Sequence, residues 1–229
     1  MDQSDIIRLI CMIPALVAGL TVHEFAHAWA ADRLGDDTPR REGRLSLDPL
    51  VHIDPFGAIF FVLSSLAGFG LGWAKPVMTN HRNLAHPRRD SLLIAIAGPI
   101  SNILQTPFWL ASVFAFGFIA QKMNLDSAQA LSTATLVGQA LLYGVVLNVA
   151  LAAFNMLPIP PLDGHWVLQS IGGRPIEELF DMIRPYSFFL LIIIINFTPI
   201  LRYTVGPFQQ WAFQTALVVQ EAGSAFALR

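Results

Sequence analysis

The sequence predicts an all-α integral membrane protein, folded as a polytopic bundle of about five to six hydrophobic segments. The chain has 229 residues, of which 54% are hydrophobic and 13% are charged. Soluble domains carry about 25% charged residues, and a water-soluble protein of this length needs more polar surface than these residues supply. The uncharged residues also gather into long intervals, so we expect a lipid bilayer to be the main solvent.

The first hydrophobic interval, residues 9–31, is interrupted only by His23, Glu24 and His27. The N-terminus before it is acidic and lacks the basic region and small-residue cleavage site of a signal peptide. We therefore expect this segment to be retained. Ionisable groups in lipid are costly and usually mark function, so the three interrupting residues are the first candidates for a site.

Five later intervals contain no charged residue: 55–74, 91–121, 127–162, 185–201 and 203–220. A spanning helix needs about 20 apolar residues. We therefore expect intervals 91–121, 127–162 and 185–201 to cross the membrane. The last interval contains Gln209, Gln210 and Gln214, and it is expected either to cross as a sixth segment or to lie at the interface.

Interval 55–74 is expected to form a re-entrant or β-hairpin-like element. Glycines weaken it as a straight helix: Gly57, Gly68, Gly70 and Gly72. Basic residues flank it on both sides: Arg33, Arg40, Arg41 and Arg44 before it, and Lys75, Arg82, Arg88 and Arg89 after it. Positive loops tend to stay cytoplasmic, and a single crossing would separate the two clusters. A segment that returns to its own side removes this conflict.

Several classes of protein are excluded by the remaining composition. The net charge is −2 and no basic run is interleaved with aromatic residues, so no nucleic-acid partner is expected. Cys11 is the single cysteine, which rules out an intrachain disulfide. No repeat and no linker divides the chain, so residues 1–229 are expected to form one domain.

His23 and His27 are four residues apart, so on a helix they share one face and can bind one metal ion. Glu24 lies beside them, where a general base would hold a water molecule. A catalytic zinc site needs a third protein ligand. Seven residues are candidates for it: Asp32, Glu42, Asp48, His52, Asp54, Asp163 and His165. The metzincin pattern is excluded, because Ala30 and Arg33 stand where it requires glycine and histidine.

Asp163 differs from the other candidates in what precedes it. Glu42 sits among four arginines, where a solvated ion pair is expected. Asp163 instead follows the longest charge-free interval and three prolines, at positions 158, 160 and 161, which cannot continue a helix. Unwound backbone at membrane depth is tolerated only inside protein or beside a watery cavity. A stiff segment of this kind can lay a carboxylate beside two histidines of another helix.

Three short motifs carry a family resemblance: His23-Glu-Phe-Ala-His27, Gly98-Pro-Ile-Ser-Asn102, and Asn155-x-x-Pro-x-Pro-x-Leu-Asp163-Gly164. Together they resemble the site-2 proteases, the intramembrane zinc metalloproteases. Stretches 43–57 and 72–77 are similar to connecting elements of the compact bacterial members. The resemblance covers about residues 9–164, the expected catalytic core, and residues 165–229 are expected to add C-terminal membrane helices. No stretch is long or polar enough for an inserted PDZ domain.

The resemblance implies that His23, His27 and Asp163 hold Zn²⁺ and that Glu24 is the general base and proton shuttle. It implies cleavage of a peptide bond in or near a transmembrane segment of a membrane protein. The expected partners are a single-span substrate, with an earlier cut by another protease left open, and the lipid bilayer. The expected location is the cell (cytoplasmic or inner) membrane, with several passes. The oligomeric state is not predicted.

Two asparagines have two interpretations each. The resemblance implies that Asn102 binds the substrate backbone or the developing oxyanion, but it could instead join two helices. Asn155 is expected to touch the substrate, but it could instead cap the unwound helix.

The histidine pair could also serve a catalytically idle membrane adaptor with a structural zinc site. A third hypothesis is a zinc-dependent hydrolase acting on lipid head groups, for which Arg33 and Arg41 would supply the phosphate contacts.

Overall fold

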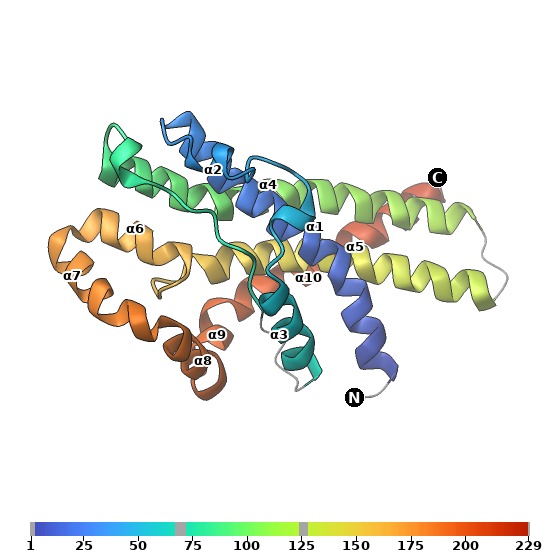
Figure 1. The fold of residues 1–229 in the computed structure, drawn as a ribbon. Coiled ribbons are helices and arrows are strands. Elements are labelled where there is room, and N and C mark those ends of the chain that lie inside the picture. Colours follow the sequence, from blue (N-terminus) through green and yellow to red (C-terminus); the bar gives the residue numbers. More distant parts are fainter. Residues whose placement is uncertain (1–2, 67–71, 124–127, 229) are drawn as a thin grey trace.

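The computed structural model describes residues 3–66, 72–123 and 128–228. Four long helices lie side by side and form its main body: α1 (Gln3–Arg33), α4 (Pro87–Lys122), α5 (Ala128–Asn155) and α10 (Gly206–Ala227). Figure 1 shows α4 and α5 extending along the bundle, with both chain termini toward the same end. The all-α prediction is confirmed, because in the described part of the chain the only β pairing is one isolated bridge.

Three of the described helices are long and apolar enough to cross a membrane: Asp5–Arg33, Pro87–Lys122 and Ser132–Asn155. They correspond to the first, third and fourth charge-free intervals. Figure 1 shows the C-terminal end of α1, the N-terminal end of α4 and the C-terminal end of α5 at one end of the bundle. The chain therefore runs toward that end twice and away from it once, in the order that the sequence predicts.

The prediction of a spanning helix over residues 185–201 is wrong. This interval divides into the end of η3 (Arg184–Tyr186), α8 (Ser187–Phe197) and the beginning of α9 (Ile200–Thr204). The 11 residues of α8 rise about 16 Å, against a hydrocarbon core of about 30 Å. The helix stops because Thr198 precedes Pro199 and is extended, with φ −127° and ψ 150°. A residue before proline is sterically pushed out of the helical region.

The last segment forms α10, which packs along α4 and α5. Its fully buried Ala212 and Ala216 join Val113 and Val145 in one apolar cluster of the bundle. Small side chains at these positions let the three helix backbones approach closely. The 22 residues of α10 are long enough to cross, yet it is not among the three helices that also meet the apolarity of a span. A membrane crossing by α10 therefore stays a prediction.

Segment 55–74 leaves the bundle and comes back to it. The short η1 (Pro49–Val51) leads into α3 (Pro55–Leu66), and the chain returns through an extended segment, residues 72–80. Ile53 and Ala74 form an antiparallel bridge, so the two ends of the segment lie next to each other. This is the geometry that the re-entrant prediction requires. Gly68 and Gly70 lie outside the described residues.

Shorter elements complete the fold at the end of the bundle where α1 finishes. They are α2 (Thr38–Arg41), η2 (His81–Asn83), α6 (Asp163–Gly172) and α7 (Arg174–Ile183). Helix α6 follows the proline-rich break after α5 and packs against α4. The break therefore returns the chain to the bundle beside the polar part of α1.

Candidate metal centre

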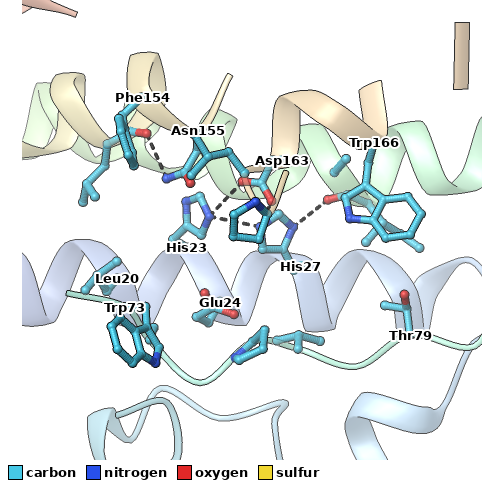
Figure 2. Close-up of a pocket in the computed structure, with 18 of the residues that line it drawn as sticks. Leu20, His23, Glu24, His27, Trp73, Thr79, Phe154, Asn155, Asp163 and Trp166 are labelled. Atoms are coloured by element: carbon cyan, nitrogen blue, oxygen red, sulfur yellow. Dashed lines mark hydrogen bonds and ion pairs between the residues drawn. The ribbon is translucent and has the colours of Figure 1, made fainter. Parts of the chain in front are cut away.

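The histidine motif lies inside α1, in the part that packs against α4 and α5. His23 and His27 are buried, as is most of Glu24. One helical turn separates the two histidines, so both imidazoles leave the helix on one face. Figure 2 shows both rings pointing across to Asp163, while Glu24 lies on another side of α1, toward the segment that carries Trp73 and Thr79.

Asp163 reaches the histidines because α5 ends at Asn155 and the chain unwinds over the next seven residues. Leu162 is extended and precedes the first residue of α6, which is Asp163 itself. A Cβ atom on Gly164 would lie 2.3 Å from the carbonyl oxygen of Met156. Only glycine permits this close approach, so the Asp-Gly pair lets α6 begin directly on the unwound turn.

The three side chains converge on one point. The His23 Nε2 atom lies 3.1 Å from Asp163 Oδ2, and the His27 Nε2 atom lies 3.3 Å from Asp163 Oδ1. The two Nε2 atoms are 3.0 Å apart. All three donor atoms fall within 4.8 Å of one another, and no other such group of three occurs among the residues that the structure describes.

The opposite side of the His23 ring is fixed by a chain of hydrogen bonds across three helices. His23 Nδ1 lies 2.7 Å from Asn102 Oδ1. The Asn102 amide donates to Gly19 O and to Asn148 Oδ1, and the Asn148 amide donates to Gly144 O. The Asn102 atom that faces the ring is an oxygen, which can only accept, so His23 Nδ1 must carry the proton. Its Nε2 lone pair then faces Asp163.

His27 has the same arrangement with a different partner. Its Nδ1 atom lies 2.7 Å from the carbonyl oxygen of Ile94 on α4. A carbonyl oxygen only accepts, so Nδ1 is the donor and Nε2 again keeps its lone pair. A partner of this kind fixes the tautomer and orientation of a metal-binding histidine.

These constraints indicate that the three residues fit a cation. Two imidazole lone pairs and a carboxylate repel one another at about 3 Å unless a positive charge lies between them. The Asp163 Oδ2 atom is buried and makes no well-aligned hydrogen bond within the described structure. Two histidines and one carboxylate leave a fourth tetrahedral position open, as in catalytic zinc sites.

Gly98 provides the space that the two rings occupy. A Cβ atom at this position would lie 2.3 Å from His27 Nε2 and 2.6 Å from His23 Nε2. Both rings are held from behind by Asn102 and Ile94, so neither can move away without breaking a buried hydrogen bond. The Gly98–Asn102 motif therefore supports both histidines from α4.

The structure places Asn102 behind His23, one of the candidate metal ligands. Its side chain is fully buried, its amide group is engaged by α1 and α5, and it does not line the cavity described below. A direct contact with substrate finds no support in this geometry, which instead matches the interpretation that Asn102 joins helices. Sequence reasoning missed Asn148, although an asparagine in the longest charge-free interval was a visible signal.

The position of Asn155 is compatible with both of its interpretations, and its contact with substrate stays a prediction. Its amide donates to Leu151 O, which lies in the last turn of α5, and the residue also lines the cavity. The remaining candidates for the third ligand lie elsewhere. Asp32 pairs with Arg40, and Glu42 is exposed. Four others bond to backbone groups in their own loops or turns: Asp48, His52, Asp54 and His165.

A cavity of about 610 Å³ opens beside the candidate metal ligands. Its lining includes all three ligands, Glu24, the extended segment and parts of α4, α5, α6 and α8. Glu24 makes no hydrogen bond or ion pair within the described residues, and Figure 2 shows its carboxylate between α1 and the extended segment. One wall thus presents the candidate ligands and a free carboxylate, and the facing wall presents extended backbone.

Comparison with known proteins agrees with this site. Residues 11–195 match the model of peptidase family M50. A protein of Bacillus subtilis (strain 168), YwhC, which is named as a proposed zinc metalloprotease, is 33% identical over 199 residues, covering 86% of this chain and 84% of the relative. The similarly named Rip2 of Mycolicibacterium smegmatis is 27% identical over 208 residues, covering 89% and 73%. No solved structure matches the chain.

The chain therefore belongs to peptidase family M50, the site-2 protease family of metalloproteases. The family resemblance seen in the short motifs is confirmed.

Proposed function

We propose that this protein is a zinc-dependent intramembrane endopeptidase. Its substrate is a transmembrane segment of another membrane protein, or the residues flanking it. The observation that carries the proposal is the place of the ligands: His23 and His27 lie within a helix that is long and apolar enough to cross a membrane, and Asp163 meets them from another element. A hydrolytic site at that depth gives access to peptide bonds that soluble proteases cannot reach.

The chemistry follows from what each residue can do. When bound, zinc polarises a carbonyl and makes a water molecule acidic near neutral pH. Glu24 takes a proton from the attacking water as the water oxygen bonds to the carbonyl carbon. Glu24 then gives this proton to the leaving nitrogen as the C–N bond breaks. The products are an amine and a carboxylic acid that keeps the second proton of the water until it ionises in solvent, and Glu24 returns to its starting state.

The substrate must be extended before it is cut, because a helix keeps its carbonyl groups in internal hydrogen bonds. The wall opposite Glu24 supplies a surface for an extended chain. Val77 and Thr79 line the cavity, and the backbone of residues 76–79 makes no hydrogen bond within the described structure. We propose that a substrate strand pairs with this edge, as in other cases of strand addition.

The proposed partner is a single-span membrane protein, and the proposed location is the cell membrane, with the site near the cytoplasmic face. The basic residues on both sides of segment 55–74 favour that orientation. Whether another protease cuts the substrate first is decided by testing full-length and shortened substrates side by side.

The enzyme is favoured over an idle adaptor by Glu24. A structural zinc site needs only its ligands, and a further carboxylate that faces the cavity beside them has no part in such a site. Glu24 is largely buried and has no hydrogen bond or ion pair in the described part of the chain. A proton-transfer role accounts for this carboxylate, whereas a scaffold does not.

The test is Glu24→Gln, which keeps the shape of the side chain but cannot accept a proton. We expect the variant to retain zinc and to cleave on the order of 100- to 10,000-fold more slowly than the wild type. Partners trapped on the variant in membranes are identified by mass spectrometry, and new termini that appear only with the wild type give the cut site.

The matched control is Glu178→Gln, because Glu178 is an exposed carboxylate on α7 that pairs only with Arg174. Cleavage at the wild-type rate by Glu24→Gln would contradict the proposal. So would the absence of zinc from the purified wild-type protein.

A further inference from the structure

The extended segment, residues 72–80, makes few backbone hydrogen bonds. Its backbone is joined to the preceding chain by the Ile53–Ala74 bridge and by the bond from Lys75 N to His52 O, which is 2.8 Å long. Beyond Lys75, the backbone makes no bond in the described structure until Asn80. Two buried side chains hold the segment at these two points.

The first is Arg44, whose side chain is only 2% exposed. Its Nη1 atom donates to Val51 O and its Nη2 atom donates to Lys75 O. No carboxylate lies within salt-bridge distance of it among the described residues, and its Nε atom is buried without a partner. Burying a guanidinium without a paired carboxylate costs folding free energy. The position of Arg44 therefore needs a structural reason, and its two carbonyl contacts supply one.

Both carbonyl groups lack a backbone donor for a local reason. In an antiparallel pair, Lys75 O would accept from His52 N, but His52 N is bonded to Pro49 O in η1. Val51 is the last residue of η1, and the last carbonyl groups of a helix have no internal donor. The planar fork of an arginine can reach two acceptors at once. Arg44 thus supplies a hydrogen-bond donor to Val51 O and to Lys75 O, the two carbonyl groups that have no backbone donor.

The second is Asp36, which is fully buried in the loop after α1. One carboxylate oxygen accepts from Asn80 N at 2.6 Å, and the other accepts from the Asn83 amide at 2.8 Å. Asp36 also accepts two bonds from Thr38 in its own loop. The far end of the extended segment is therefore attached to the end of α1, the helix that carries the candidate metal ligands.

We propose that Arg44 is a positioning residue for substrate binding: together with Asp36 it holds residues 76–79 at a fixed distance from Glu24. This inference rests on the proposed function, because the held edge is the one that the substrate strand would join. Arg44 itself does not line the cavity. It acts through Lys75, the residue directly before the unpaired edge.

The test compares Arg44→Met and Arg44→Lys with the wild type, using a purified full-length protein and a single-span substrate. We expect Arg44→Met to raise KM roughly tenfold with little change in kcat, since an interaction used equally in the ground and transition states is lost. Arg44→Lys can reach one carbonyl and should restore part of the loss. The control is Arg174→Met, which removes an exposed arginine of α7.

A double-mutant cycle with Val77→Pro separates this role from general stability. Val77→Pro removes a backbone donor from the edge. If Arg44 acts through the edge, the double variant should bind substrate no more weakly than Val77→Pro alone. Additive effects of the two changes would overturn the proposal. So would Arg44→Met with an unchanged KM, or with a loss of zinc equal to its loss of activity.

Hydrogen exchange tests the anchoring without any turnover. In Arg44→Met, the Lys75 amide, which bonds to His52 O, should exchange faster, whereas amides of α1 and α4 should keep the wild-type rate. Equal acceleration across the whole protein would show a general folding role and overturn the proposal. If the wild type cleaves no substrate, the proposed function fails, and the exchange rates of Arg44→Met and Arg44→Lys still decide whether Arg44 holds the segment.

Discussion

The two walls of the cavity are built in opposite ways. The wall that carries His23 and His27 belongs to a bundle of long helices, and each imidazole is held by a buried hydrogen bond from behind. The facing wall, residues 72–80, is largely exposed and is attached at Lys75 by Arg44 and at Asn80 by Asp36. Metal ligands need an accurate geometry, while a surface that receives different strands needs free backbone groups.

The two walls should therefore carry different parts of the function. Changes to the helical wall should alter metal binding and therefore the chemistry. Changes to the extended wall should alter how the substrate is held, with the metal retained.

The largest effect is expected on the helical wall, from Gly98→Ala. The added methyl group would lie 2.3 Å from His27 Nε2, and both rings are pinned. Overpacking of this kind costs about 1–3 kcal/mol, and here it falls on the ligands themselves. We expect zinc content and cleavage to be almost abolished, as measured by metal analysis and a cleavage assay.

Gly206→Ala is the matched control, because a Cβ atom there would meet only Leu201 O, at 3.7 Å. If Gly98→Ala retained a full complement of zinc, the two rings would not be fixed as described.

A smaller effect is expected from Asn102→Ala, which removes the acceptor of His23 Nδ1. Loss of such a partner typically lowers metal affinity about 10- to 100-fold. Competition with a chelator measures this change. Because Asn148 acts on His23 only through Asn102, the double variant with Asn148→Ala should bind zinc as weakly as Asn102→Ala alone.

Ser112→Ala serves as the control, since Ser112 is half-buried and its hydroxyl bonds within α4, to Phe108 O. Unchanged metal affinity in Asn102→Ala would show that the hydrogen bonds of Asn102 and Asn148 do not support zinc binding by His23.

The smallest effect is expected on the extended wall, from Asp36. Burial alone would raise the pKa of Asp36, but the hydrogen bonds from Thr38, Asn80 and Asn83 outweigh it and hold the pKa below the ordinary value of 3.8. A lowered pKa stabilises the fold above the ordinary value, and the stabilisation is lost as the pH falls below it. Asp36→Asn should therefore cost about 2 kcal/mol near neutral pH.

This difference from the wild type should shrink below about pH 4, in thermal unfolding curves followed by circular dichroism. Zinc content near neutral pH should not change. A stability difference that is constant from pH 7 to about pH 3 would show that the charge of Asp36 is unimportant.

The sequence predicts the helical wall better than the extended one, for physical reasons. The spacing of His23 and His27 fixes their common face, and the prolines before Asp163 force the break that brings it back. Each of these is a local rule. The failure at residues 185–201 was also local in cause, because the Thr198–Pro199 step ends α8 and hydropathy alone does not show it.

The extended wall depends on contacts between residues far apart in the chain. Arg44 meets Lys75 and Asp36 meets Asn80, and no periodicity or spacing links these pairs. The basic cluster that contains Arg44 indicated only which side of the membrane it occupies. Its burial could be found only from the folded structure.

X-ray absorption at the zinc edge of the purified Glu24→Gln variant tests whether His23, His27 and Asp163 together bind one zinc ion. We expect one zinc per chain with two imidazole nitrogens at about 2.0–2.1 Å and a carboxylate oxygen at about 2.0–2.2 Å, and a further Asp163→Ala change should lower the zinc content or the number of nitrogen and oxygen neighbours. A spectrum with one imidazole or none, or one that Asp163→Ala leaves unaltered, would contradict this expectation.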